Sequence, residues 1–139
     1  MASFAGLFIL FVIYIMNKSV SKKSSNKVII LRLLSFSNSI KLFHWNTRSY
    51  SLHISSDNLF NQLLLLIDSL VEILIGNSRM PCFSHSLKVQ LCSDSQFIPL
   101  LSSFKTFILS LKKRDNVSNI CDDIINAIDH FIYFSSFKN

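Results

Sequence analysis

The spacing of apolar residues predicts four helices in the body of the chain. Within each of four stretches, apolar side chains recur three or four residues apart, which places them on one face of a helix. These stretches cover about residues 27–47, 51–75, 97–114 and 117–131. The helical period, and not the two-residue alternation of strands, therefore organises the sequence.

The second stretch is apolar nearly all round, as expected for a helix that packs against several partners. It ends at Gly76-Asn77, residues that commonly stop helices. The polar connection 77–95 contains Pro81 and is long enough to cross from one end of a bundle to the other. We therefore expect an all-α fold, a four-helix bundle with one long crossing connection.

Small polar residues precede two of the predicted helices. Ser24, Ser25 or Asn26 can cap the first helix, because their side chains accept hydrogen bonds from free backbone N–H groups. Asp115 or Asn116 can cap the fourth helix in the same way.

Composition agrees with one small helical domain. The chain has 139 residues, of which 50% are hydrophobic and 13 are Phe. Only 2 Gly and 2 Pro occur, too few for the many tight turns of an all-β protein. The 3 Cys residues have no CxxC or CxxH spacing, which favours reduced, packed thiols over a disulfide framework or a zinc site. The sequons at Asn17 and Asn116 are then chance matches.

An apolar run from Phe4 to Met16 opens the chain, with no charged side chain before Asn17. Residues 2–16 span roughly 22 Å as a helix, somewhat less than the ~30 Å hydrocarbon core of a bilayer. Charges follow the run instead of preceding it, which argues against a cleaved signal peptide. We predict an uncleaved anchor that contacts membrane lipid through residues 2–16. The alternative is an apolar arm that is buried or bound to a partner.

Basic residues follow this run. The net charge is +6, and residues 1–56 hold 7 basic and no acidic side chains. Lys18, Lys22 and Lys23 would hold the end of the anchor on the cytoplasmic side. Because these lysines would meet lipid headgroups first, binding to nucleic acid is not expected. The predicted parts are a membrane anchor (1–17), a basic linker (18–26) and a cytoplasmic helical domain (27–139).

The stretch 44–72 carries the candidate chemistry: His44, His53, Asp57, Asp68 and Glu72. The last four fall within an arc of about 100° on one helix. Imidazole and carboxylate together suit iron, manganese or zinc better than calcium or magnesium. A lone histidine on an apolar face is more often a hydrogen-bonded core residue, and a lone acidic pair is more often solvated. Asp68 and Glu72 differ because apolar residues surround them, so burial without a cation would be costly.

The distance along the helix limits which of these residues can bind the same metal ion. His53 and Glu72 are 19 residues apart, roughly 28 Å along one helix, so one chain cannot bring both to a single metal ion. Two chains can, if their second helices pack antiparallel across a two-fold axis. The sequence therefore predicts a homodimer or larger homo-oligomer with metal ligands from both chains.

His44-Trp45-Asn46 resembles the motif that ends the first helix of Dps proteins, the ferritin-like mini-ferritins. His53 with Asp57 resembles that family's second histidine and nearby aspartate, and Asp68 with Glu72 its Asp-x-x-x-Glu pair. The turn between the histidines is about three residues shorter here. The chain is also similar to short ferritin-like proteins of large DNA viruses and phages, through residues 44–53 and the end Ile132-Tyr133-Phe134.

The resemblance implies an all-α fold, a ferritin-like four-helix bundle that follows an N-terminal hydrophobic anchor helix. It also implies a ferroxidase that oxidises Fe(II) with peroxide or oxygen at a di-metal site between subunits. It implies His44 and His53 of one chain and Asp68 and Glu72 of its mate as primary ligands, with Asp57 bridging or orienting. Trp45 would lie beside the site as electron donor or shield, or else be an interfacial core aromatic. Alternatively, the protein is a structural or minor capsid or membrane component of a virus particle, partnered by other viral structural proteins, and its ligand set is a relict.

Overall fold

The computed structural model describes residues 25–76, 78–79, 86–114 and 116–137. The predicted anchor, its flanking Lys18, Lys22 and Lys23, and most of the basic linker lie outside these residues. Four α-helices and no strand are found within the described residues: α2 (Asn26–Asn46), α3 (Tyr50–Ile75), α4 (Asp94–Leu111) and α5 (Ser118–Ser135). The predicted all-helical, four-helix architecture is confirmed.

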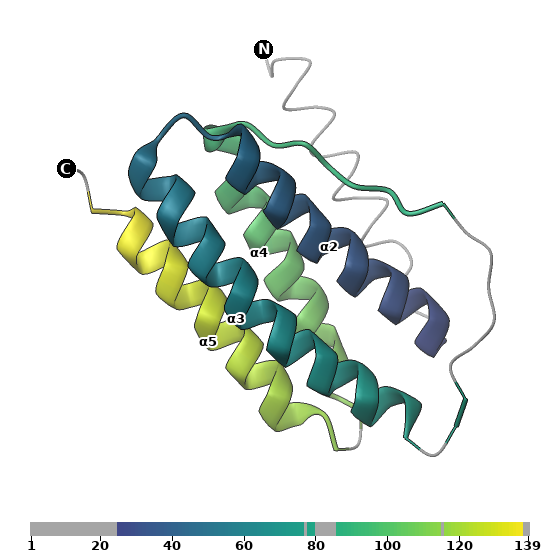
Figure 1. Ribbon diagram of the computed structural model, residues 1–139. Coiled ribbons are helices and arrows are strands. Elements are labelled where there is room, and N and C mark those ends of the chain that lie inside the picture. The colour runs from purple at the N-terminus through teal and green to yellow at the C-terminus, as the bar shows by residue number, and fades with distance from the viewer. Residues whose placement is uncertain (1–24, 77, 80–85, 115, 138–139) are drawn as a thin grey trace, which may run out of the picture.

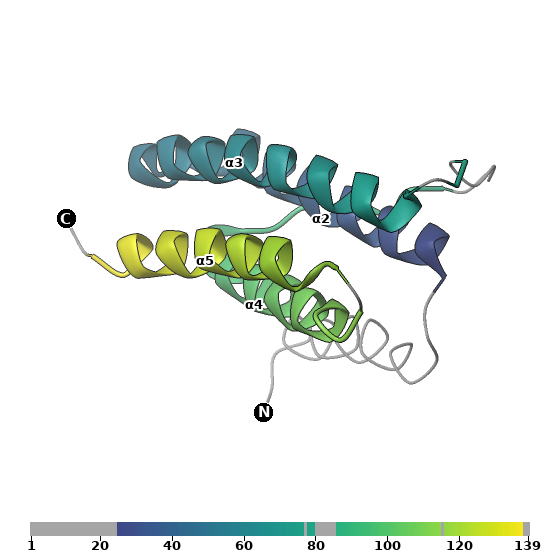
Figure 2. The ribbon, with the colours of Figure 1, turned by 90° about the horizontal axis from the view of Figure 1, so that it is seen from below.

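The helices pack in two layers, with α2 and α3 in one layer and α4 and α5 in the other (Figure 2). Within each layer the two helices run antiparallel and are joined by a short turn (Figure 1). The ends of α2, α3 and α4 meet at Asn26, whose side-chain amide donates to the Leu74 carbonyl at 2.7 Å. The Arg114 guanidinium donates to the oxygen of the same amide at 3.0 Å.

Between the end of α3 and the start of α4 the chain crosses to the opposite end of the bundle, as predicted. Residues 86–93 lie extended beside α2 (Figure 1). Two serines of α2 hold this segment: the Ser35 hydroxyl donates to the Lys88 carbonyl, and the Gln90 N–H donates to the Ser39 hydroxyl at 2.8 Å. Because the connection returns the chain to the end where α3 begins, α3 and α4 run in the same direction (Figure 1).

Phenylalanine side chains fill much of the space between the layers. Phe43 of α2 stacks on Phe97 of α4 with ring centroids 3.6 Å apart, and Phe36 stacks on Phe104 at 4.5 Å. Burying such rings is the main source of stability in a small domain. The core also takes aliphatic residues from all four helices, among them Ile29, Leu33, Ile40, Leu59, Leu63, Ile67, Leu70, Leu101, Ile108, Ile124 and Ile128.

Two helix starts differ from the prediction. Helix α4 begins three residues earlier than expected because Ser93 and Gln96 form a capping box, in which each side chain bonds the other residue's backbone N–H. Asn116 does not cap α5: the N-cap is Val117, and Asn116 lies in the preceding turn with φ of 65°. Asp115 lies outside the described residues. Ser25 precedes α2 but makes no side-chain capping bond.

Helix α3 leaves much of its apolar surface exposed. Its buried stripe is Ser56, Leu59, Leu63, Ile67 and Leu70. Outside this stripe Leu65 is 72% exposed and Leu64 49%, and Ile54 and Ile73 are exposed too. By length and composition alone, α3 is the single helix among the described residues that is long and apolar enough to span a membrane, a property that core helices of bundles share. The other surfaces of α3 contact α2 and α5 (Figure 2).

Candidate metal centre

The turn between α2 and α3 brings His44 and His53 together. It spans only residues 47–49, and the Thr47 hydroxyl accepts a bond from the Ser49 N–H at 3.2 Å. The Ser49 hydroxyl then caps α3 by accepting from the Leu52 N–H. With His44 in the last turn of α2 and His53 in the first turn of α3, the two rings stack with centroids 4.0 Å apart.

The two histidines bond each other's backbone. The distance from His44 Nδ1 to the His53 carbonyl oxygen is 2.8 Å, and from His53 Nδ1 to the His44 carbonyl oxygen 2.9 Å. A carbonyl oxygen only accepts, so both Nδ1 atoms must carry the proton. In the neutral rings both Nε2 atoms are then unprotonated. This is the tautomer that metal-binding histidines adopt when Nδ1 is held by a backbone carbonyl.

Asp57 completes a cluster at this end of the bundle. Its Oδ1 lies 3.8 Å from His44 Nε2 and 2.7 Å from the ammonium nitrogen of Lys41 on α2. The hydrogen bond from Lys41 is the main reason that the pKa of Asp57 falls below its usual value, with smaller contributions from the Lys41, His44 and His53 charges. Asp57 is therefore a carboxylate at neutral pH, next to two imidazoles.

Asp68 and Glu72 lie elsewhere in the same chain. Both are exposed on α3, beyond the reach of the histidines, and no ion pair to either occurs within the described residues. The expectation that apolar neighbours bury them does not hold for a single chain. No group of three His, Cys, Asp or Glu residues in the described part of the chain is arranged to hold a metal ion. The structure thus brings together His44, His53 and Asp57 but not the acidic pair.

Trp45 and Lys41 border the cluster. Trp45 is 68% exposed, so it is not a core residue of the single chain. The Lys41 ammonium lies 5.9 Å from the centroid of the Trp45 indole and 4.9 Å from that of the Phe60 ring. Sequence reasoning counted Lys41 only as one of many basic residues. The position of Lys41 three residues before His44, on the same side of the helix, could have identified it as a neighbour of the site.

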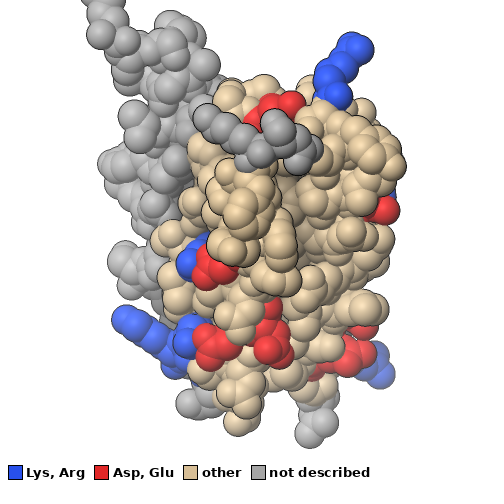
Figure 3. All heavy atoms as spheres, turned by 90° about the vertical axis from the view of Figure 1, so that its left-hand side faces the viewer, with Lys and Arg blue, Asp and Glu red and all other residues tan. Residues whose placement is uncertain are grey.

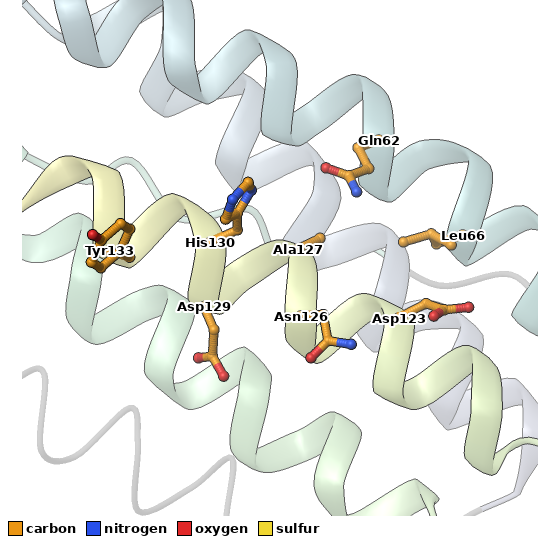
Figure 4. Close-up of a pocket in the computed structure, with 8 residues that line it drawn as sticks. All are labelled: Gln62, Leu66, Asp123, Asn126, Ala127, Asp129, His130 and Tyr133. Atoms are coloured by element: carbon orange, nitrogen blue, oxygen red, sulfur yellow. The ribbon is translucent and has the colours of Figure 1, made fainter.

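A separate groove lies on the other flank of α3, between it and α5. It has a volume of about 620 Å³, and Figure 4 shows Gln62 and Leu66 of α3 facing residues of α5 across it. Its α5 side is formed by Asp123, Asn126, Ala127, Asp129, His130 and Tyr133. Asp129 is bound to Lys105 of α4 at 2.6 Å. On the face shown in Figure 3, basic and acidic side chains occur in mixed groups, with no broad patch of one sign.

These features define an all-helical, four-helix bundle with a histidine–aspartate cluster at one end. The chain belongs to the family described as "Family of unknown function (DUF5856)", whose match covers residues 44–134. The match includes α3, α4, all but the last residue of α5, and all five candidate ligands. No curated protein and no solved structure matches the chain.

Proposed function

We propose that the protein is a membrane-tethered, ferritin-like bundle that binds iron between two copies of the chain and oxidises Fe(II). The observation that carries this proposal is the pairing of His44 with His53. When the rings are neutral, their reciprocal bonds to backbone carbonyls leave both Nε2 atoms unprotonated, and that of His44 lies 3.8 Å from Asp57 Oδ1. Such a donor set fits a transition-metal ion.

Spacing along α3 supports a shared site. In an antiparallel pair of α3 helices, His53 meets Glu72 of the second copy if the two-fold axis passes midway between those positions. Asp57 meets Asp68 of the second copy if the axis passes midway between 57 and 68. Both midpoints fall between Gln62 and Leu63. One axis therefore serves both pairs, and each dimer would hold two equivalent sites.

The surface around that axis suits burial against a second copy. Leu64 and Leu65 lie close to the axis and are exposed in the single chain. Leu34 of α2 and Trp45 are exposed as well. Exposed apolar side chains in such number favour an interface with another copy of the chain. Asp68 and Glu72, exposed in one chain, would become buried there and would need a cation for compensation.

The chemistry would follow from this ligand set. Two Fe(II) ions each lose one electron, and one hydrogen peroxide takes both electrons with two protons to give two waters. His44 and His53 would bind through Nε2, and the carboxylates would balance the increased charge of the product ions.

The residues 2–16 would hold the domain on the cytoplasmic side of a membrane or in a virion. Full-length protein should then sediment with membranes, and its recovery in the soluble fraction without detergent would contradict the tether.

Metal uptake tests the proposal against its non-enzymatic alternative, a structural component of a virus particle. Full-length protein in detergent should bind Fe(II), Zn(II) or Mn(II) at micromolar concentrations and oxidise Fe(II) on addition of peroxide. Asp68→Asn with Glu72→Gln should abolish both properties. The matched control, Asp123→Asn on α5, should retain them, because Asp123 lines the other groove. A wild-type protein that takes up none of the three ions would favour the structural alternative.

A further inference from the structure

Lys41 occupies a formed cation position beside the candidate ligands. Its ammonium lies 2.7 Å from Asp57 Oδ1, while the Phe60 ring centroid is 4.9 Å away and the Trp45 centroid 5.9 Å away. The lysine side chain is only 26% exposed. A carboxylate and two aromatic faces together attract a cation more strongly than a surface carboxylate does.

The other two lysine–aspartate pairs among the described residues differ from this one. Lys105 pairs with Asp129 and Lys112 with Asp122, each at 2.6 Å. No aromatic ring is found over either ammonium within the described parts of the chain, and neither carboxylate there forms an ion pair with a histidine. Only Asp57 of the three carboxylates also faces an imidazole nitrogen, at 3.8 Å.

We propose that Lys41 is the resident cation of this cluster and that a divalent ion binds there by displacing its ammonium from Asp57. The inference rests on the proposed metal site and adds its regulation. Metal affinity would then be set by competition between the ion and a cation of the chain itself. Without metal, Lys41 would keep the Asp57 carboxylate compensated and the cluster intact.

The geometry explains why the two cations exclude each other. His44 Nε2 and Asp57 Oδ1 are 3.8 Å apart, close enough that both would serve as ligands of one divalent ion at the usual distance of about 2.1 Å. The same Oδ1 already accepts the hydrogen bond from Lys41. A divalent ion and an ammonium on one oxygen would repel each other across a few ångströms, a strong repulsion in a partly buried site. The long lysine side chain lets the ammonium move into solvent at little cost.

The test compares Lys41→Met with a matched control, Lys105→Met. Both substitutions keep an apolar stem and remove one ammonium from a short ion pair, but only the first lies at the cluster. Zn(II) binding to the full-length protein in detergent is measured by calorimetry. We expect Lys41→Met to bind Zn(II) about tenfold more tightly than wild type and Lys105→Met to match wild type. Equal or weaker binding by Lys41→Met would overturn the inference while leaving the proposed metal site in place.

A second readout follows Lys41 itself. Acetylation of lysines by a water-soluble reagent, with mass spectrometry of each site, is compared with and without Zn(II). We expect modification of Lys41 to rise severalfold with Zn(II) while that of Lys105 stays constant. Zn(II) binding without any change at Lys41 would overturn the inference alone. If none of the three proteins binds Zn(II), the inference and the proposed function both fail.

Discussion

The histidine pair shows how a short turn can set the chemistry of a side chain. His44 and His53 each donate from Nδ1 to the other's backbone carbonyl, so their tautomers are set by the geometry of the α2–α3 turn. The pair was predictable as a candidate, because His53 and Asp57 are one helical turn apart and His44 ends the preceding helix. The reciprocal bonds were not, since they depend on how tightly residues 47–49 close the turn.

These bonds should contribute to stability without metal. His53→Ala removes the stacked ring and the donor to the His44 carbonyl, so it should lower the free energy of unfolding by about 1–2 kcal/mol. His53→Asn retains a donor close to the position of Nδ1 and should lose less. Urea unfolding followed by circular dichroism measures both, with His130→Ala, at an exposed histidine of the groove between α3 and α5, as control. Equal losses for all three variants would contradict the bonding role.

The lowered pKa of Asp57 predicts that the stability of the fold depends on pH. The pKa of this carboxyl is lower in the folded chain than in the unfolded chain, chiefly through the bond from Lys41. The stabilisation that it gives is therefore complete above the unfolded pKa of about 4 and is lost as the pH falls through the lower folded value. The stability advantage of wild type over Asp57→Asn should therefore shrink as the pH falls below about 4 and should vanish in more acidic solution. A difference that grows on acidification would contradict the sign of the pKa shift.

At the scale of elements, the apolar period predicted the helices well and their ends less well. The start of α4 was missed because Asp94, Ser95 and Gln96 look like loop residues until the capping box is recognised. Asn116 was expected to cap α5, but it adopts a positive φ and so belongs to the turn. The surface of α3 is apolar nearly all round, so the sequence could not show which part of it packs against the other helices of the same chain. Asp68 and Glu72 were therefore expected to be buried, and they are exposed.

We predict that two copies of the chain associate through helix α3. Leu64 lies near the proposed axis and is about half exposed, so Leu64→Arg should leave the fold of the single chain intact. It should nevertheless convert dimers to monomers, because each copy would place a charge in the interface. Sedimentation in detergent measures the change, and circular dichroism checks the fold. Leu109→Arg, at a similarly exposed leucine of α4, is the matched control and should stay dimeric. A monomeric wild type would contradict both the interface and the shared site.

At the scale of the whole molecule, the bundle places its histidine–aspartate cluster at one end of α3 and its acidic pair toward the other. The described part of one chain holds no complete metal site, whereas a dimer with the proposed two-fold axis would hold two complete sites. This division of the ligands between two chains predicts that two variants, each without a working site, can restore one site together.

The most direct test uses mixed dimers. One chain carries His44→Asn and His53→Asn, which keep donors near Nδ1 but remove Nε2, and the other carries Asp68→Asn and Glu72→Gln. Each variant alone should neither bind Zn(II) nor oxidise Fe(II). Mixed dimers isolated through two different tags should regain one of their two sites, with half the wild-type Zn(II) stoichiometry and up to half its rate of Fe(II) oxidation. Mixed dimers as inactive as either parent, beside an active wild type, would contradict a site shared between two chains.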